Sequence, residues 1–487
     1  ALSIGVEDGV SPRVELGPLD GRITHRHKDN VVTYSAGFDN LDAQAALRLA
    51  RRLAATEWIE ERWGQELDQF SASGLIKLFD VSLQLNEPAQ WNWQKAEVQS
   101  SLVFEKLSVL HQNPDTGQRA GFENLSGQLS GDNQSGSWKL SGSNSRIVLE
   151  ELFPEKVLAF DTLKGQGSWS MPQGLEQGIT FAFNDLSAQN SDLHALLRGE
   201  YQFAQGRSDQ LNIQGLLKRA EIAQIPGYLP SVLGTQVRAW LDNNLKGGVV
   251  KDATFLANGP VQEFPFHDSA NEDHQFEIKI PVSKAQLTFA PDWPLIEAIE
   301  GQVMISGRTL KVQADSAKTN QVDLSDVQVV IDNLAAPQTV LNIQGLAKGE
   351  LAQLLAYTRA SPVGGFIGGA LAQSEAVGQA SLDLSLTVPL ADTRKTSVTG
   401  VLNFERNRLR VVREMPWVSN LEGQVSFSDT GLQLSNVRGQ ALGHPLSVNG
   451  GTGRRGLIIQ ANGVASDTEL AKYLSPFLKP YLKGQTA

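Results

Sequence analysis

The segment SLDLSLTV, Ser381 to Val388, decides the fold class because its apolar and polar residues alternate without interruption. Successive side chains of a β-strand point to opposite faces, so the three leucines and Val388 would share one face. The serines, Asp383 and Thr387 would share the other face. This period of two predicts a strand with one dry face and one wet face.

The same alternation recurs along most of the chain, in short segments about ten residues apart. Glycine, asparagine, aspartate or proline stands between these segments, which is the pattern of antiparallel meanders. The segments contain the apolar sets Ile179, Phe181, Phe183; Phe276, Ile278, Ile280; Val303, Ile305; Leu310, Val312; Val327, Val329, Ile331; Val398, Leu402, Phe404; Val425, Phe427; and Leu432, Leu434.

Composition supports a chain made of many short elements. It has 487 residues, with 45 Gly, 41% hydrophobic residues and only 7% aromatic residues. Few helices are predicted, too few to cover so many one-sided strands, so the sheet must bury its apolar face by folding over as a sandwich, a barrel or a curved trough. We expect a mainly β fold: an elongated, continuous, antiparallel and repeating β-groove, a curved trough with a few short helices between repeats.

Internal repeats define the organisation. LNIQG occurs at Leu211 to Gly215 and at Leu341 to Gly345, each time before a short helix-like stretch that ends in proline. A looser copy lies at Trp138 to Pro154, and a further copy at Val32 to Leu53 leads into a helix that we expect Asp39 or Asn40 to cap. A second phrase, Leu287 to Val303, aligns without gaps to Leu409 to Val425. We expect one continuous groove over 1–487, with approximate repeat units 1–70, 71–160, 161–230, 231–362 and 363–487.

Charge and cysteine content exclude several classes of function. A net charge of −11 opposes binding to a nucleic-acid backbone, which needs clustered Lys and Arg. The absence of cysteine excludes thiolate zinc sites and thiol nucleophiles. No stretch approaches 18 uninterrupted apolar residues, and Ala1 to Val10 lacks the pattern of a signal peptide, so we interpret the chain as a soluble piece of something longer.

Catalytic and metal-binding motifs are not found. His25 and His27 have the spacing of two residues on one strand face, but only Asp29 is a nearby carboxylate and no third ligand is evident. No nucleophile elbow, zinc-protease helix, phosphate loop or dinucleotide-binding glycine pattern occurs. We therefore expect no catalytic residue, no metal and no cofactor, and we interpret the chain as a non-enzyme.

One long segment resembles a known family. From Ile225 to Phe266 the chain reads IPGYLPSVLGTQVRAWLDNNLKGGVVKDATFLANGPVQEFPF, and Trp293-Pro294 follows. This segment is similar to the conserved part of AsmA-like envelope proteins. An Asn124-Leu125-Ser126-Gly127 turn and Ser361-Pro362 fit the same pattern, so the similarity extends through nearly the whole chain. The chain departs from the family in lacking an N-terminal membrane anchor, which favours a fragment.

The resemblance implies a bridge across the Gram-negative envelope. Such a protein is anchored in the inner membrane, lies in the periplasm and carries phospholipid toward the outer membrane or its proteins through a repeating β-groove. The partners implied are phospholipid acyl chains and the two membranes, without nucleic acid. One-sided strands fit this function, because many similar apolar surfaces worth about 0.8 kcal/mol per buried CH₂ would favour sliding over trapping.

The residues predicted to contact acyl chains are Phe181, Phe183, Phe276, Ile278, Ile305, Val329, Ile331, Leu384, Leu386, Leu402, Phe404, Phe427 and Leu434. We interpret Phe264-Pro265-Phe266 and Trp293-Pro294 as structural bends, because proline ends strand pairing. Two alternatives stay open. One is a passive β-solenoid scaffold of the envelope with a sealed core, and the other is a glycan-processing enzyme.

Overall fold

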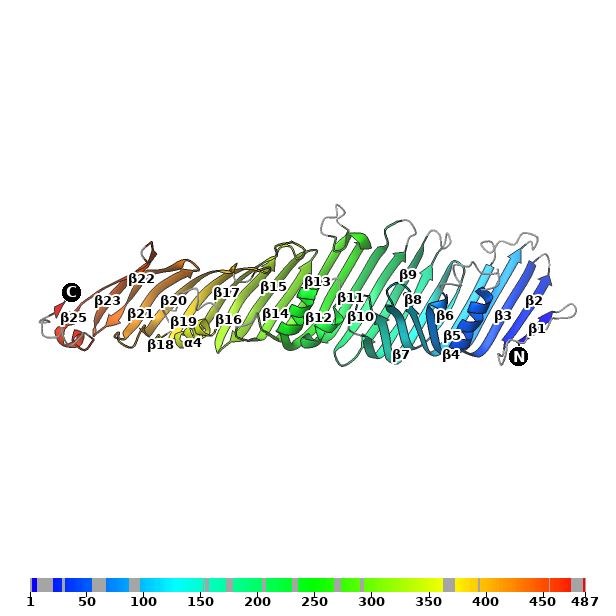
Figure 1. Ribbon diagram of the computed structural model, residues 1–487, viewed down its shortest axis with the longest axis horizontal. Coiled ribbons are helices and arrows are strands. Elements are labelled where there is room, and N and C mark those ends of the chain that lie inside the picture. Colours follow the sequence, from blue (N-terminus) through cyan, green and yellow to red (C-terminus); the bar gives the residue numbers. More distant parts are fainter. Residues whose placement is uncertain are drawn as a thin grey trace. The chain divides into compact units, whose positions relative to one another are not determined.

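The structure is a computed structural model that describes residues 2–6, 21–28, 31–54, 67–86, 97–151, 153, 157–171, 178–203, 207–229, 235–266, 273–289, 293–361, 373–392, 395–454, 456–473 and 485–486. These residues are mostly strands, and 24 of the strands belong to one sheet (Figure 1). The chain divides into two compact units. The first contains Ala1–Asp242 with Asp252–Glu277, and the second contains Asn243–Lys251 with Ile278–Ala487.

The first unit consists of consecutive strands with one helix inserted early and a short helical stretch near its end. In chain order its elements are β1 (Leu2–Val6), β2 (Gly21–Lys28), β3 (Val31–Asp42), α1 (Ala43–Ala54), β4 (Phe70–Asn86), β5 (Glu97–Gln112), β6 (Arg119–Asp132), β7 (Ser135–Leu149), β8 (Leu158–Ser170), β9 (Ile179–Gln189), β10 (Leu193–Phe203), β11 (Gln210–Glu221) and the 3₁₀ helix η3 (Ile222–Tyr228). Four elements come next, α3 (Thr235–Asn244), β12 (Leu245–Pro260), η5 (Val261–Glu263) and β13 (Gln275–Leu287), and both β12 and β13 contribute residues to each unit.

The second unit continues in the same way. Its elements are β14 (Ile296–Ser306), β15 (Thr309–Thr319), β16 (Val322–Ile331), β17 (Val340–Glu350), α4 (Leu351–Arg359), β18 (Glu375–Val377), β19 (Gln379–Pro389), β20 (Ser397–Arg410), β21 (Val418–Ser428), β22 (Gly431–Ala441), β23 (His444–Gly453), β24 (Gly456–Gly463), β25 (Ala465–Ser466), α6 (Asp467–Leu470) and β26 (Gln485–Thr486).

Strand pairing within each unit largely follows chain order and is antiparallel, although β1 pairs in parallel with β2. The short strand β18 also departs from chain order, because it pairs with β20 while β17 pairs directly with β19. The described residues place β23 beside β24 and no further strand on the other edge of β24, so the sheet is open there. The prediction of a mainly β chain with a long antiparallel sheet and few short helices is confirmed.

A row of β-bulges bends the strands of each unit. In β5, β6 and β21 the pairing register shifts beside Lys106, Asn124 and Asn420, which have φ values of 48°, 61° and 47°. One extra residue in the left-handed region kinks a strand and increases its twist. Asparagine tolerates this conformation better than most residues, because its short side chain can form local hydrogen bonds.

These bulges correct one prediction. The segment Asn124 to Gly127, expected to form a turn, lies inside strand β6. Its left-handed Asn124 is followed by Leu125, which is 2% exposed. The same order recurs at Asn420 and Leu421, which is 3% exposed. At both positions the Asn-Leu pair therefore forms a bulge from which the leucine side chain points into the core.

Helices follow the strands at which the sequence repeats predict them. LNIQG lies in β11 and again in β17, and η3 and α4 follow directly. Helix α1 follows β3, as expected, but Asp42 caps it rather than Asp39 or Asn40, because the Asp42 carboxylate accepts a hydrogen bond from the backbone N–H of Ala45 at 2.9 Å. The expected division into five repeat units stays a prediction.

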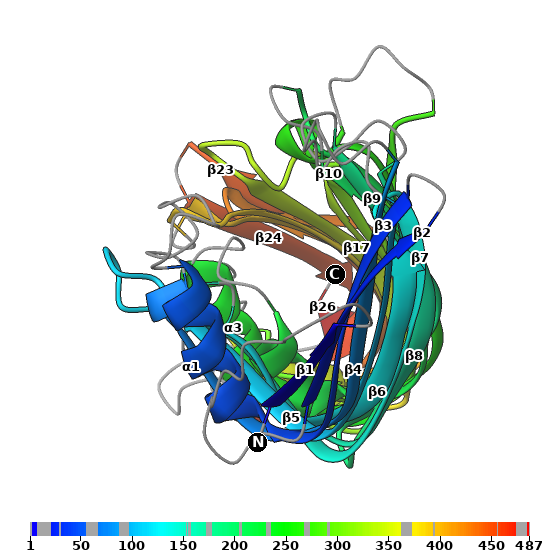
Figure 2. The same ribbon diagram turned by 90° about the vertical axis from the view of Figure 1, so that its right-hand side faces the viewer.

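In the first unit the sheet curves and α1 lies within the curve (Figure 2). Ala45, Ala46 and Leu49 of α1 pack against the buried pair Phe38 and Leu41 of β3, and so does Phe79 of β4. We call the sheet face that α1 covers in the first unit, and that α4 covers in the second, the inner face. The opposite face is the outer face.

Candidate functional site: the apolar inner face

The inner face of the second unit carries unbroken rows of aliphatic side chains. One row crosses six strands, and each member pairs directly with the next in register. Its members are Val303, Val312, Val329, Ile343, Leu386 and Val398. Neighbouring strands lie about 4.8 Å apart, so such a row forms a continuous hydrocarbon strip across the strands.

The nine predicted acyl-contact residues of the second unit's strands β14 to β22 all lie on this face. Ile305 pairs with Leu310, which pairs with Ile331. Leu402 pairs with Val425, which pairs with Leu434. Leu384, Leu386, Phe404 and Phe427 alternate with outward polar residues such as Asp383, whose carboxylate accepts a long hydrogen bond of 3.5 Å from Asn403. The strand alternation is thus the signal that places these residues together.

In the first unit the inner face is apolar but more aromatic. One row runs through Phe79, Leu102, Leu129, Trp138, Gly167 and Phe183, each paired with the next. Phe181 lies two residues from Phe183 and is 39% exposed. Phe276 contacts the ring of Phe255 with centroids 6.0 Å apart. Ile278, two residues later in the same strand β13, already belongs to the second unit.

Glycines on this face lie beneath aromatic rings. A Cβ atom added to Gly400 would overlap the ring of Phe427, and one added to Gly167 would overlap the indole of Trp138. Glycine therefore lets a large ring lie down over the neighbouring strand instead of projecting from it. The largest side chains therefore project less far from the sheet on the inner face.

Helix α4 covers part of the inner face. Its buried residues Leu351, Leu354 and Leu355 form one cluster with Leu382 and Phe404, and Phe404 is only 8% exposed. Ile331 and Leu386, at 7% and 5% exposed, are buried in a second cluster. Leu384 and Phe427 are partly exposed and pack against both clusters. Beside these buried residues, Leu384 and Phe427 are thus members of the inner face that keep accessible apolar surface.

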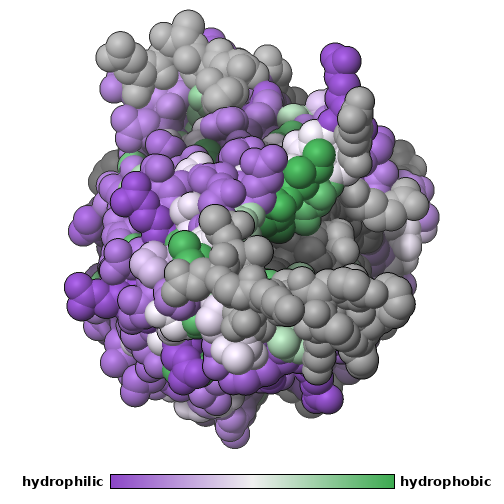
Figure 3. Space-filling view, turned by 90° about the vertical axis from the view of Figure 1, so that its left-hand side faces the viewer, coloured by the Kyte–Doolittle hydropathy of each residue, from purple (hydrophilic) through white to green (hydrophobic). Residues whose placement is uncertain are grey.

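The view of the C-terminal end shows a hollow with hydrophobic side chains on part of its wall and a mainly hydrophilic exterior (Figure 3). Exposed apolar residues at this end include Leu457, Ile458 and Ile459 of strand β24, which are 43%, 53% and 52% exposed. Apolar surface thus reaches the last strand of the open sheet.

A tyrosine fixes η3 to the inner face of the first unit. The hydroxyl of Tyr228 donates to Asp192 at 2.8 Å and accepts from the amide of Asn190 at 2.8 Å, while its ring packs against the buried cluster that includes Phe160 and Leu163. Burial, together with the hydrogen bond to Asp192, raises the pKa of Tyr228 to about 12. The hydroxyl therefore stays neutral and serves as a structural tie.

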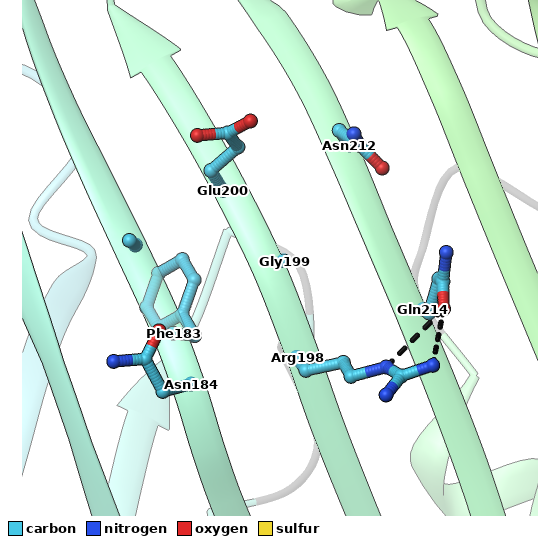
Figure 4. A pocket seen from close by; sticks show the side chains of 8 residues that line it. Phe183, Asn184, Arg198, Gly199, Glu200, Asn212 and Gln214 are labelled. Carbon is cyan, nitrogen blue, oxygen red and sulfur yellow. Dashed lines mark hydrogen bonds between the residues drawn. The ribbon is translucent and has the colours of Figure 1, made fainter.

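A polar depression of about 460 Å³ lies across β9, β10 and β11 (Figure 4). Arg198 donates to Gln214 from Nε at 3.2 Å and from Nη2 at 2.9 Å, and Glu200 lies two residues along the same strand. Arg198 and Glu200 alternate with inner-face residues Leu197, Gly199 and Tyr201, so they belong to the outer face. The charged lining of this depression does not suit a hydrocarbon chain.

Metal-ligand clusters are not formed by the part of the chain that the structure describes, where no three His, Asp or Glu residues come together. His25 pairs with Tyr34 and His27 with Val32 in the β2–β3 ladder. Sequence reasoning missed a different feature, the packing of Phe289 and Trp293 against the inner face. The two aromatic residues four positions apart, Phe289 and Trp293, were the signal in the sequence that could have suggested it.

The family comparison agrees with this architecture. A family model described as YhdP protein matches residues 15–487. The chain belongs to the YhdP family. Among curated proteins, the intermembrane phospholipid transporter YhdP of Escherichia coli (strain K12) is 24% identical over 332 residues, which is 68% of this chain and 25% of that protein. No solved structure matches the chain.

This YhdP-family chain thus matches only about a quarter of the length of its E. coli relative. Among the described residues, no helix is both long enough and apolar enough to cross a membrane. Tyr228 and Trp293, which carried the resemblance to AsmA-like proteins, both pack against inner-face clusters.

Proposed function

We propose that this YhdP-family chain transports phospholipids between the inner and outer membranes without catalysis, by holding acyl chains against its inner face while headgroups stay in water. The observation that carries the proposal is the one-sided apolarity of consecutive strands, best seen in the row from Val303 to Val398. Apolar area hidden from water stabilises a bound chain in proportion to its length.

The name of the E. coli relative supports the cargo, since that protein is an intermembrane phospholipid transporter. The wider functional context is part of the same proposal. It includes a periplasmic location, an inner-membrane anchor in the parent protein, contact with the outer membrane or its proteins, and a contribution to outer-membrane lipid homeostasis and the permeability barrier.

The sealed scaffold keeps one observation in its favour. Helix α4 buries Leu382 and Phe404, so part of the inner face is an ordinary protein core. However, Leu384 and Phe427 stay partly exposed, and so do Leu457 and Ile459, which share the inner face of β24. A scaffold with a sealed core would cover these side chains as well.

Mass spectrometry of organic extracts from the purified chain tests the proposal. Phospholipid that copurifies in a reproducible ratio to protein, and that exchanges with labelled phospholipid in added vesicles, is the expected result. An extract without phospholipid, together with no uptake from vesicles, would contradict transport and favour the sealed scaffold.

A further inference from the structure

Phe289 and Trp293, which lie between strands β13 and β14, meet helix α4, a segment distant in sequence, at the inner face of the second unit. Phe289 follows strand β13 and Trp293 precedes strand β14, and their ring centroids lie 5.4 Å apart at an interplanar angle of 79°. Trp293 also contacts Tyr357 of helix α4, with centroids 6.5 Å apart at 60°. Such edge-to-face contacts are favourable beyond the area that they bury. We call Phe289, Trp293 and Tyr357 the aromatic bridge.

The aromatic bridge lies over residues predicted to hold acyl chains. Phe289 and Trp293 pack against the cluster that contains Ile331 and Leu386. Tyr357 belongs to α4, whose leucines form the neighbouring cluster with Phe404. The bridge thus connects α4 with Phe289 and Trp293. Leu384 and Phe427 pack against the same cluster as Phe289 and Trp293, and also against the cluster of α4.

Exposure decides which side chains an incoming hydrocarbon chain meets first. Leu386 and Phe404 are 5% and 8% exposed, whereas all three bridge rings are partly exposed. The bridge carries no charge at neutral pH, and burial of the Tyr357 hydroxyl, which raises its pKa to about 12, keeps it neutral further into the alkaline range. A surface of neutral rings accepts methylene groups without leaving a charge unsolvated.

We propose that the aromatic bridge, rather than Leu386 and Phe404, is the main acyl-chain contact of the second unit, and that Trp293 keeps acyl chains off the Leu386 row. This inference rests on the proposed function, since it names the residues at which phospholipid meets the groove. The ligand is the hydrocarbon chain of a phospholipid, recognised by apolar contact alone. Removing the Trp293 side chain should open the row beneath it.

Site-specific photo-crosslinking in the full chain tests this assignment. A diazirine side chain is placed at position 293, 384, 386 or 383, and the protein is incubated with vesicles of phosphatidylethanolamine and phosphatidylglycerol. Mass spectrometry then counts lipid adducts. We expect adducts at 293 and 384, and few at buried Leu386 or outward Asp383.

Combining the diazirine at 386 with Trp293→Ala gives the decisive comparison. Labelling at 386 should rise about tenfold, equivalent to a change of about 1.4 kcal/mol in access to that row. Trp293→Phe, which retains a ring, should leave labelling at 386 low. Circular dichroism and thermal unfolding confirm that each variant folds.

The possible outcomes separate the two proposals. Labelling at 384 without labelling at 293 would overturn the aromatic bridge while leaving phospholipid transport intact. So would strong labelling at 386 in the chain that retains Trp293. Absence of labelling at every inner-face position, with vesicle uptake also absent, would overturn both.

Discussion

The ring of Phe427 lies over Gly400, the residue directly opposite it in the β20–β21 ladder. A side chain at Gly400 would occupy the space of the ring, so Phe427 would have to lift away from the sheet. Trp138 and Gly167 repeat this relationship in the first unit. These aromatic rings thus lie along the surface of the sheet and do not project into the groove.

Gly400→Ala should therefore destabilise the chain. Forcing a ring out of a packed position costs about 1–3 kcal/mol. Urea unfolding followed by circular dichroism measures the change. Gly453→Ala is the matched control, because Gly453 is also in a strand but nothing lies within 4 Å of an added Cβ, and its effect should stay within about 0.5 kcal/mol. Equal effects of the two substitutions would show that Phe427 does not depend on Gly400.

Asn407 should be among the polar residues on which folding depends most. It is fully buried at a bulge of β20, donates to the carbonyl of Gln379 at 2.9 Å and accepts from the backbone N–H of Glu405 at 2.7 Å. Asn407→Ala leaves both backbone groups without their partner and should cost about 1–3 kcal/mol. Asn403→Ala is the control, since both hydrogen bonds of the Asn403 side chain are 3.5 Å long. The idea fails if both variants unfold at the same urea concentration.

The strands and their inner faces could be predicted from sequence because alternation with period two is a local signal. In Ser381 to Val388 each residue reports its face directly, and the register of β17, β19 and β20 confirms the assignment. Repetition of LNIQG likewise predicted where helices follow strands. Strand faces and helix positions depend on residues that are close together in the sequence, so the sequence alone is enough to predict them.

Burial on the inner face could not be predicted in this way. Alternation predicts the same strand face for Leu384 and Leu386, yet Leu386 is buried and Leu384 is partly exposed. Burial depends on residues from other parts of the chain, since Trp293 packs against the cluster that contains Leu386 and α4 belongs to the neighbouring cluster. The bulge at Asn124 was also mistaken for a turn, because a left-handed asparagine is common to both structures.

Stability should depend on pH in the alkaline range through Tyr357. Its pKa is raised to about 12 by burial, whereas an exposed tyrosine has a pKa near 10. Between these values the unfolded chain releases the proton and the folded chain retains it, so the free energy of unfolding falls as pH rises from about 10 to 12. Below pH 10 both states hold the proton, and the stabilisation is fully present.

Tyr357→Phe should remove this part of the pH dependence. Urea unfolding at pH 9 and pH 11 measures it, with a difference between the two proteins on the order of 1 kcal/mol at the higher pH. The other tyrosines titrate in both proteins, so the comparison isolates Tyr357. Parallel stability curves for the two proteins across this range would contradict the assignment.

A pair of adjacent residues tests the inner face most directly. Leu384 points to the inner face beside Phe427, and Ser385 points to the outer face. Leu384→Lys places an ammonium group among hydrocarbon chains and should lower copurified phospholipid per chain about tenfold. Ser385→Lys adds the same charge one residue away, where water solvates it, and should leave the phospholipid content unchanged.

Folding must be separated from lipid binding in this comparison, because Leu384 also packs against two buried clusters. Leu384→Met, which keeps the apolar character and nearly the volume, should retain phospholipid at a small cost in stability. If Leu384→Lys and Ser385→Lys lost phospholipid equally while both remained folded, the two faces would be equivalent for lipid. The one-sided groove would then be wrong, since only an inner-face path makes the position of a single charge decisive.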